Sequence, residues 1–82
     1  MNLMQGDIID VVGELYHFSR HIVLNSFYDD EYEEKVYSTY AIYVADESDE
    51  DRLHTVWKMP LDSYVERDRD NHVIVVGRQN EK

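Results

Sequence analysis

The 82-residue sequence contains no cysteine, one proline and only three glycines. Without cysteine the chain has neither a disulfide framework nor a thiolate metal site, and thiol-based catalysis is excluded. The glycines, at positions 6, 13 and 77, lie too far apart for a phosphate-binding loop. No apolar run approaches the length of a membrane span, and the first residues lack the features of a signal peptide. These absences favour one cytoplasmic domain over residues 1–82, with flexible ends at 1–5 and 78–82.

No set of residues matches a known catalytic or metal-binding arrangement. No serine lies in a nucleophile elbow. Glu14 and His17 have the spacing of a di-iron ligand pair on a helix, but the sequence has one copy and such a site needs two. Residues 46–51, DESDED, lack the central glycine and terminal bidentate glutamate of a calcium loop. We therefore expect no catalytic residue, no metal and no cofactor, and a protein that is not an enzyme.

Alternating apolar residues predict strands in the second half of the chain. Residues 35–45 form the clearest strand, and at about 3.3 Å per residue they span roughly 36 Å if straight. Residues 53–59 alternate around Trp57, and Pro60 ends that strand because proline has no N–H to donate. Residues 61–64 fit one 3₁₀ turn that carries Tyr64 over the sheet. Residues 72–76 predict a short buried strand.

The first third of the chain fits two structures. As strands, residues 7–12 and 15–27 would be joined by a turn at Gly13 and Glu14. As a helix, residues 7–27 would present one apolar stripe and pack on an antiparallel sheet, giving an α+β fold. The β-branched residues and Gly13 favour strands, so we predict a mainly β domain built as a small antiparallel barrel.

Pro60, Tyr64 and Val65 resemble a loosened form of the P-S-N-Y-V segment of SH3 domains, with one extra residue. SH3-like barrels have a 3₁₀ turn between their last two strands. The resemblance therefore implies an SH3-like barrel with such a turn at 61–64. The other residues of a polyproline-binding groove are not found, so it bears on fold alone.

Residues 13–18, 33–37 and 57–66 resemble, in order, a bacterial and phage domain family of unknown function, number 1653. Its pattern runs roughly G-x-x-Y-x-V, E-E-x-V-V-Y and W-x-x-P-x-x-x-F-x-E, and the similarity spans residues 6–76. Tyr64 stands where the pattern has Phe, and Met59 where it usually has Arg. That family has no established activity. The resemblance implies a compact β domain in a bacterial host cell.

The net charge of −10 is concentrated in two short segments. The first acidic run comprises Asp29, Asp30, Glu31, Glu33 and Glu34. The second acidic run comprises Asp46, Glu47, Asp49, Glu50 and Asp51. Because these ten carboxylates account for the whole net charge, they form two poles at opposite ends of the strand predicted at 35–45. Solvated loop tips are the simpler interpretation, while binding to a basic surface is the functional one.

Two functions agree with these features. The first is a phage-type inhibitor whose acidic runs replace nucleic-acid phosphates on the basic surface of a nucleic-acid-binding or defence protein. The second is a module that binds a nucleotide, another small molecule or a peptide on an aromatic face. The candidate rings are Tyr37, Tyr43, Trp57 and Tyr64, which would otherwise fill the core. Direct binding to DNA or RNA is not expected, because the eight basic residues form no patch.

Overall fold

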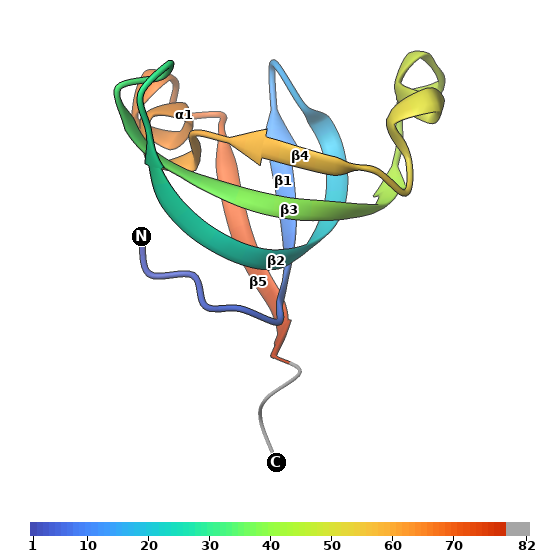
Figure 1. The fold of residues 1–82 in the computed structure, drawn as a ribbon. Helices are drawn as coiled ribbons and strands as arrows, with labels where there is room; N and C mark the ends of the chain where they lie inside the picture. Colours follow the sequence, from blue (N-terminus) through green and yellow to red (C-terminus); the bar gives the residue numbers. More distant parts are fainter. Residues whose placement is uncertain (79–82) are drawn as a thin grey trace.

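The computed structural model describes residues 1–78 and shows a five-stranded antiparallel sheet with two short helices (Figure 1). The elements are β1 (Asp7–Gly13), β2 (His17–Asp29), β3 (Glu34–Val44), the 3₁₀ helix η1 (Glu47–Arg52), β4 (Val56–Met59), α1 (Leu61–Arg67) and β5 (His72–Arg78). The strand order in the sheet is β4-β3-β2-β1-β5. The predicted mainly β fold is confirmed, and the alternative helix over residues 7–27 is wrong because those residues form β1 and most of β2.

The turn between β1 and β2 depends on Gly13. This residue has φ of +147°, a conformation that side chains disfavour. A Cβ atom at this position would also collide with the side chain of Asn71 and the hydroxyl group of Tyr64. Gly13 therefore lets the β1–β2 turn approach the segment between α1 and β5.

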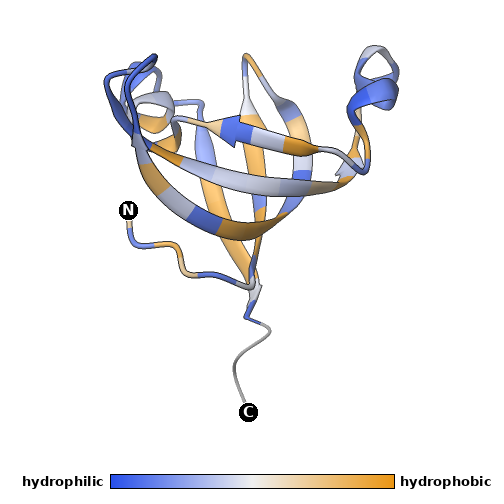
Figure 2. Cartoon of the chain, viewed as in Figure 1, coloured by the Kyte–Doolittle hydropathy of each residue, from blue (hydrophilic) through white to orange (hydrophobic). Residues whose placement is uncertain are grey.

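The core lies on the concave face of the curved sheet. Strand pairing places Tyr37 opposite Met59 and Thr39 opposite Trp57, so that these four side chains share the inner face. The core cluster contains Ile9, Val11, Tyr16, Val23, Tyr37, Ala41, Trp57, Met59, Leu61 and Tyr64. Figure 2 shows strongly apolar segments along β1, β2 and β5, whereas most of β3 is of intermediate hydropathy. In β3 the buried side chains of Tyr37, Thr39 and Ala41 alternate along the strand, while Val36 is buried as well and Tyr43 is half exposed.

The structure corrects two features of the predicted barrel. The sheet is not closed, because β4 and β5 are its two edges and do not pair with each other. Residues 61–67 form an α-helix instead of a single 3₁₀ turn at 61–64, and the N–H of Tyr64 donates to the carbonyl of Pro60 in the i to i−4 pattern. An open curved sheet with α1 beside one end therefore replaces the closed SH3-like barrel.

The last two strands also differ from the prediction. β4 begins only at Val56, because His54 has a left-handed backbone with φ of +63°. β5 extends to Arg78 and is not buried, since it lies at the edge of the sheet. Its side chains of Ile74 and Val76 are 51% and 46% exposed.

The N-terminal segment runs across the end of the sheet formed by β2 and β3. The carbonyl oxygen of Met1 accepts a hydrogen bond from the Tyr37 hydroxyl group at 2.8 Å, and Gly6 N–H donates to the carbonyl of Val23. Of the flexible end expected at 78–82, Arg78 belongs to β5 and residues 79–82 lie outside the described part. Neither helix in residues 1–78 is long and apolar enough to cross a membrane.

Replacement of Trp57 tests the packing of the core. The ring is 4% exposed, so Trp57→Ala should lower the free energy of unfolding by about 3–5 kcal/mol, a large part of the stability of a small domain. Tyr43→Ala is the control, because that ring is 50% exposed and its loss should cost less than about 1 kcal/mol. Urea denaturation measures both. Equal losses for the two variants would contradict this core.

Candidate functional site

The first acidic run is organised by Asp29, the last residue of β2. Its side chain is almost fully buried, and one oxygen accepts the backbone N–H groups of Glu31 and Tyr32 at 2.8 and 3.0 Å. The other oxygen lies 2.7 Å from Nζ of Lys58 on β4. The hydrogen bond from Lys58 is the main cause that lowers the pKa of Asp29. Asp29 therefore belongs to the fold, since it shapes the β2–β3 turn and ties it to β4.

The other members of this run differ in how they are held. Glu34 accepts a hydrogen bond from the hydroxyl group of Ser63 on α1 at 3.1 Å, and Glu31 lies 4.0 Å from Lys58 Nζ. Asp30 and Glu33 are exposed, and no described residue forms an ion pair with them. The turn thus presents two carboxylates that the fold does not use.

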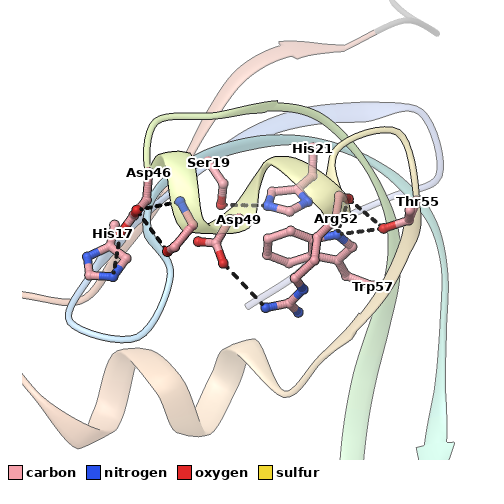
Figure 3. Close-up of polar contacts among 9 residues, drawn as sticks. His17, Ser19, His21, Asp46, Asp49, Arg52, Thr55 and Trp57 are labelled. Atoms are coloured by element: carbon pink, nitrogen blue, oxygen red, sulfur yellow. Dashed lines mark hydrogen bonds and ion pairs between the residues drawn. The ribbon is translucent and has the colours of Figure 1, made fainter.

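The second acidic run forms η1, where the sequence predicted a loop. Asp46 is its N-cap, because its side chain accepts the backbone N–H of Ser48 at 2.9 Å. The same carboxylate lies 3.3 Å from Nε2 of His17 in the preceding hairpin (Figure 3). The hydrogen bond from the Ser48 backbone is the first cause that lowers the pKa of Asp46. Asp46 therefore fixes where η1 begins.

Arg52 attaches η1 to the core. Its guanidinium carbon lies 4.1 Å from the centroid of the Trp57 ring, and its carbonyl oxygen accepts the indole N–H at 3.0 Å. Asp49 lies 3.8 Å from the guanidinium group, so this carboxylate is also paired within the helix (Figure 3). Glu47, Glu50 and Asp51 are exposed and form no ion pair with any residue in 1–78. Three carboxylates of η1 are thus available for a partner.

A buried polar cluster lies under the Trp57 ring. The ring of His21 is fully buried, with Nε2 at 2.7 Å from Ser19 Oγ and Nδ1 at 3.1 Å from Thr39 Oγ1. Thr39 also donates to the sulfur atom of Met59 at 3.4 Å. A neutral imidazole with its proton on Nδ1 satisfies these contacts. Burial first, and then the nearby charge of Arg52, lowers the pKa of His21 to about 4.

The two acidic runs lie at opposite ends of β3, as predicted (Figure 1). The fold uses five of the ten carboxylates, Asp29, Glu31, Glu34, Asp46 and Asp49, through ion pairs or hydrogen bonds. The free carboxylates, a name we use for the remaining five, are Asp30, Glu33, Glu47, Glu50 and Asp51.

The four rings predicted as an aromatic surface do not form one. Tyr37, Trp57 and Tyr64 are 1–4% exposed and belong to the core, which excludes them from a surface site. Only Tyr43 faces solvent. It packs edge-to-face on Phe18, with ring centroids 5.7 Å apart.

Tyr43 instead lines a groove that sequence reasoning missed. Phe18, Arg20, Ile42 and Tyr43 border about 430 Å³ of open space on the convex face of β2 and β3. Arg20 is held there by two hydrogen bonds to Asp10, at 2.6 and 2.9 Å. Residues 18 and 20 alternate with the buried residues 19 and 21, and this pattern could have placed them on the outer face.

Comparisons with known proteins identify no relative. No protein family, no curated protein and no solved structure matches the chain. The resemblance to the family of unknown function number 1653 therefore stays a prediction. Within residues 1–78, no group of three or more His, Cys, Asp or Glu side chains is arranged to hold a metal ion.

The different roles of neighbouring carboxylates give a stability prediction. Asp29→Asn should lower the midpoint of thermal unfolding, because it removes the charge that pairs with Lys58. Asp30→Asn should leave the midpoint unchanged or raise it, because Asp30 is exposed and surrounded by like charge. Calorimetry of the two variants provides the measurement. An equal effect of both changes would mean that Asp29 has no structural role.

Protonation of His21 gives a pH prediction. The unfolded chain binds a proton at this ring near pH 6.5, whereas the folded chain binds it only near pH 4. The unfolded state therefore holds more protons at this ring between these values, so the contribution of His21 to stability falls by roughly 3 kcal/mol as the pH drops from 6.5 to 4. NMR titration of the imidazole should show a neutral ring at pH 5.5 in the folded protein. Protonation of the ring above pH 6 would overturn this prediction.

Proposed function

We propose that this chain is a non-enzymatic acidic binding protein that occupies the basic surface of a nucleic-acid-binding protein. Carboxylates would take the place of nucleic-acid phosphates, as in a phage-type inhibitor of a nucleic-acid-processing or defence protein. The partner would be a protein, and the chain itself would bind neither nucleic acid nor membrane.

The observation that carries this proposal is the set of free carboxylates. Asp30 and Glu33 project from the β2–β3 turn, and Glu47, Glu50 and Asp51 from η1. Residues three apart in a 3₁₀ helix lie on the same side, about 6 Å apart along the axis, so Glu47 and Glu50 form a row. Because such charges repel one another, gathering them does not stabilise the fold. It does strengthen the attraction to a basic partner.

The two segments that carry the free carboxylates, the β2–β3 turn and η1, are held in place by the fold. Asp29 fixes the β2–β3 turn through two backbone N–H groups, and Asp46 and Arg52 fix the two ends of η1. Pre-organised charges lose less conformational entropy on binding than charges on a mobile loop. The structured acidic runs therefore support binding more than they support simple solvation.

The size of the molecule suits contact with a nucleic-acid-binding surface. Its longest extent is 34 Å between Cα atoms. One turn of duplex DNA is about 34–36 Å long, so the two runs fit within the span of a protein channel that holds one turn. The partner's surface would carry Lys and Arg side chains, and binding would weaken as salt is added.

The groove beside Tyr43 supports a second candidate function, the binding of a peptide or another small ligand. Phe18 and Tyr43 offer aromatic surface, and the ion pair of Arg20 with Asp10 offers polar groups. The three buried rings cannot take part, so this site differs from the one that the sequence suggested.

Neutralising the free carboxylates tests the proposal. The variant Asp30→Asn, Glu33→Gln, Glu47→Gln, Glu50→Gln, Asp51→Asn should keep its fold, because it leaves Asp29, Asp46 and Asp49 in place. A partner is first captured from bacterial lysate at low salt and eluted with short duplex DNA, which competes only for a phosphate-binding surface. The variant should then associate with the purified partner roughly ten-fold more slowly at low salt, measured by surface plasmon resonance.

Two controls accompany this measurement. Asp30→Asn with Glu33→Gln is compared with Glu14→Gln and Glu66→Gln, which remove the same charge from exposed sites outside the runs. The first pair should slow association more than the second. If duplex DNA elutes no captured protein, or if the five-residue variant associates at the wild-type rate, phosphate mimicry is wrong. Loss of binding on Tyr43→Ala alone would favour the groove.

A further inference from the structure

We propose that β5 is a dimerisation edge, at which a second copy of this chain adds its own β5 in antiparallel orientation. The two sheets would then continue into each other across a two-fold axis. Dimerisation at β5 does not depend on what the acidic runs bind.

The two edges of the sheet are protected very differently. β4 has four residues, carries Lys58 and is followed by Pro60, and all three features hinder pairing with another strand. β5 has seven residues, with neither a charge nor a proline between His72 and Arg78. Along one edge β5 pairs with β1, and no described segment pairs with its other edge. β5 therefore presents an unpaired edge that proteins commonly cover.

The side chains of β5 add an apolar surface to this edge. Ile74, Val75 and Val76 are 51%, 36% and 46% exposed, and the strand is apolar along most of its length in Figure 2. Ile74 lies opposite Asp10 on the convex face, while Val73 and Val75 lie opposite Val11 and Ile9 on the concave face. A strand that joins this edge would therefore gain apolar contacts on both faces.

Charge favours a second copy as the occupant of this edge. Residues 1–66 carry four basic and fifteen acidic side chains, so two copies repel each other across most of their surface. Residues 67–78 carry three arginines and two aspartates, so their own charges sum to +1. Two copies can therefore approach along β5 without bringing the acidic runs together. The acidic runs flank β3, three positions from β5 in the sheet, and would stay exposed.

One register makes this edge complementary to itself. If Ile74 lies opposite Ile74 of the second copy, Val73 lies opposite Val75. Side chains on the convex face of one copy then stay on the convex face of the combined sheet, and likewise for the concave face. The same register places Arg78 opposite Asp70, twice by symmetry. Asp70 is exposed and forms no ion pair with a residue in 1–78, and Arg78 is 40% exposed beside Asp7. An ion pair between Arg78 of one copy and Asp70 of the other would thus form at each end of the paired strands.

Sedimentation equilibrium over a series of concentrations tests the proposal. The wild-type chain should reach twice its 9.8 kDa mass, and added salt should not dissociate it, because salt screens repulsion between the acidic copies. Ile74→Lys should weaken dimerisation at least about ten-fold, as a charge is placed in the apolar contact. Val56→Lys is the matched control, since Val56 is an exposed β-branched residue of the other edge strand and its change should leave the dimer intact. A monomeric wild-type chain, or a dimer that survives Ile74→Lys, would overturn the proposal.

Charge exchange tests the register separately. Arg78→Glu and Asp70→Arg should each weaken the dimer, because like charges then face each other at both ends. A mixture of the two variants should dimerise again, since each copy supplies the charge that the other needs. Circular dichroism confirms that both variants are folded. Failure of the mixture to recover, with both variants folded, would overturn this register.

Discussion

Burial of the Trp57 ring is the contact on which the rest of this structure depends. The ring lies against the fully buried His21 at a centroid distance of 4.7 Å and under the guanidinium group of Arg52 at 4.1 Å. Its N–H donates to the carbonyl of Arg52, which holds the end of η1 against the sheet. One side chain thus joins the core of a small open sheet to the segment that carries half of its concentrated negative charge.

Several of the negative charges also have structural roles. A small domain has few interactions to spare, and this one uses carboxylates as structural groups: Asp29 shapes a turn, Asp46 caps η1 and Asp10 fixes Arg20. The free carboxylates remain after these roles are filled. They stand next to the structural ones in the sequence, so the elements that the structural carboxylates fix also carry the free carboxylates.

Local sequence patterns predicted most of the strands, but they could not predict contacts between residues far apart in the sequence. The alternation in β3 and the break at Pro60 follow from backbone geometry alone, as does the turn at Gly13. The open sheet was not predictable in this way, because closure depends on whether β4 and β5 meet. The division of the acidic runs into structural and free carboxylates was not predictable for the same reason. Asp29 and Asp30 are alike in the sequence, and only the fold places Lys58 beside Asp29. Tyr37 and Tyr43 share an alternation pattern in the sequence, but the register shift between Arg20 and His21 pairs Tyr43 with Arg20 on the convex face, while Tyr37 stays in the core.

The most direct test of the central claim, that ordered free carboxylates form the binding surface, is NMR of the side-chain carboxyl carbons during titration with an oligoarginine peptide. This peptide represents a basic protein surface without any fold of its own. The signals of Asp30, Glu33, Glu47, Glu50 and Asp51 should shift, while those of Asp29 and Asp46 should stay in place because their oxygens are already engaged. Equal shifts at Asp29 and Asp46, or the largest changes at the Tyr43 ring, would contradict the claim.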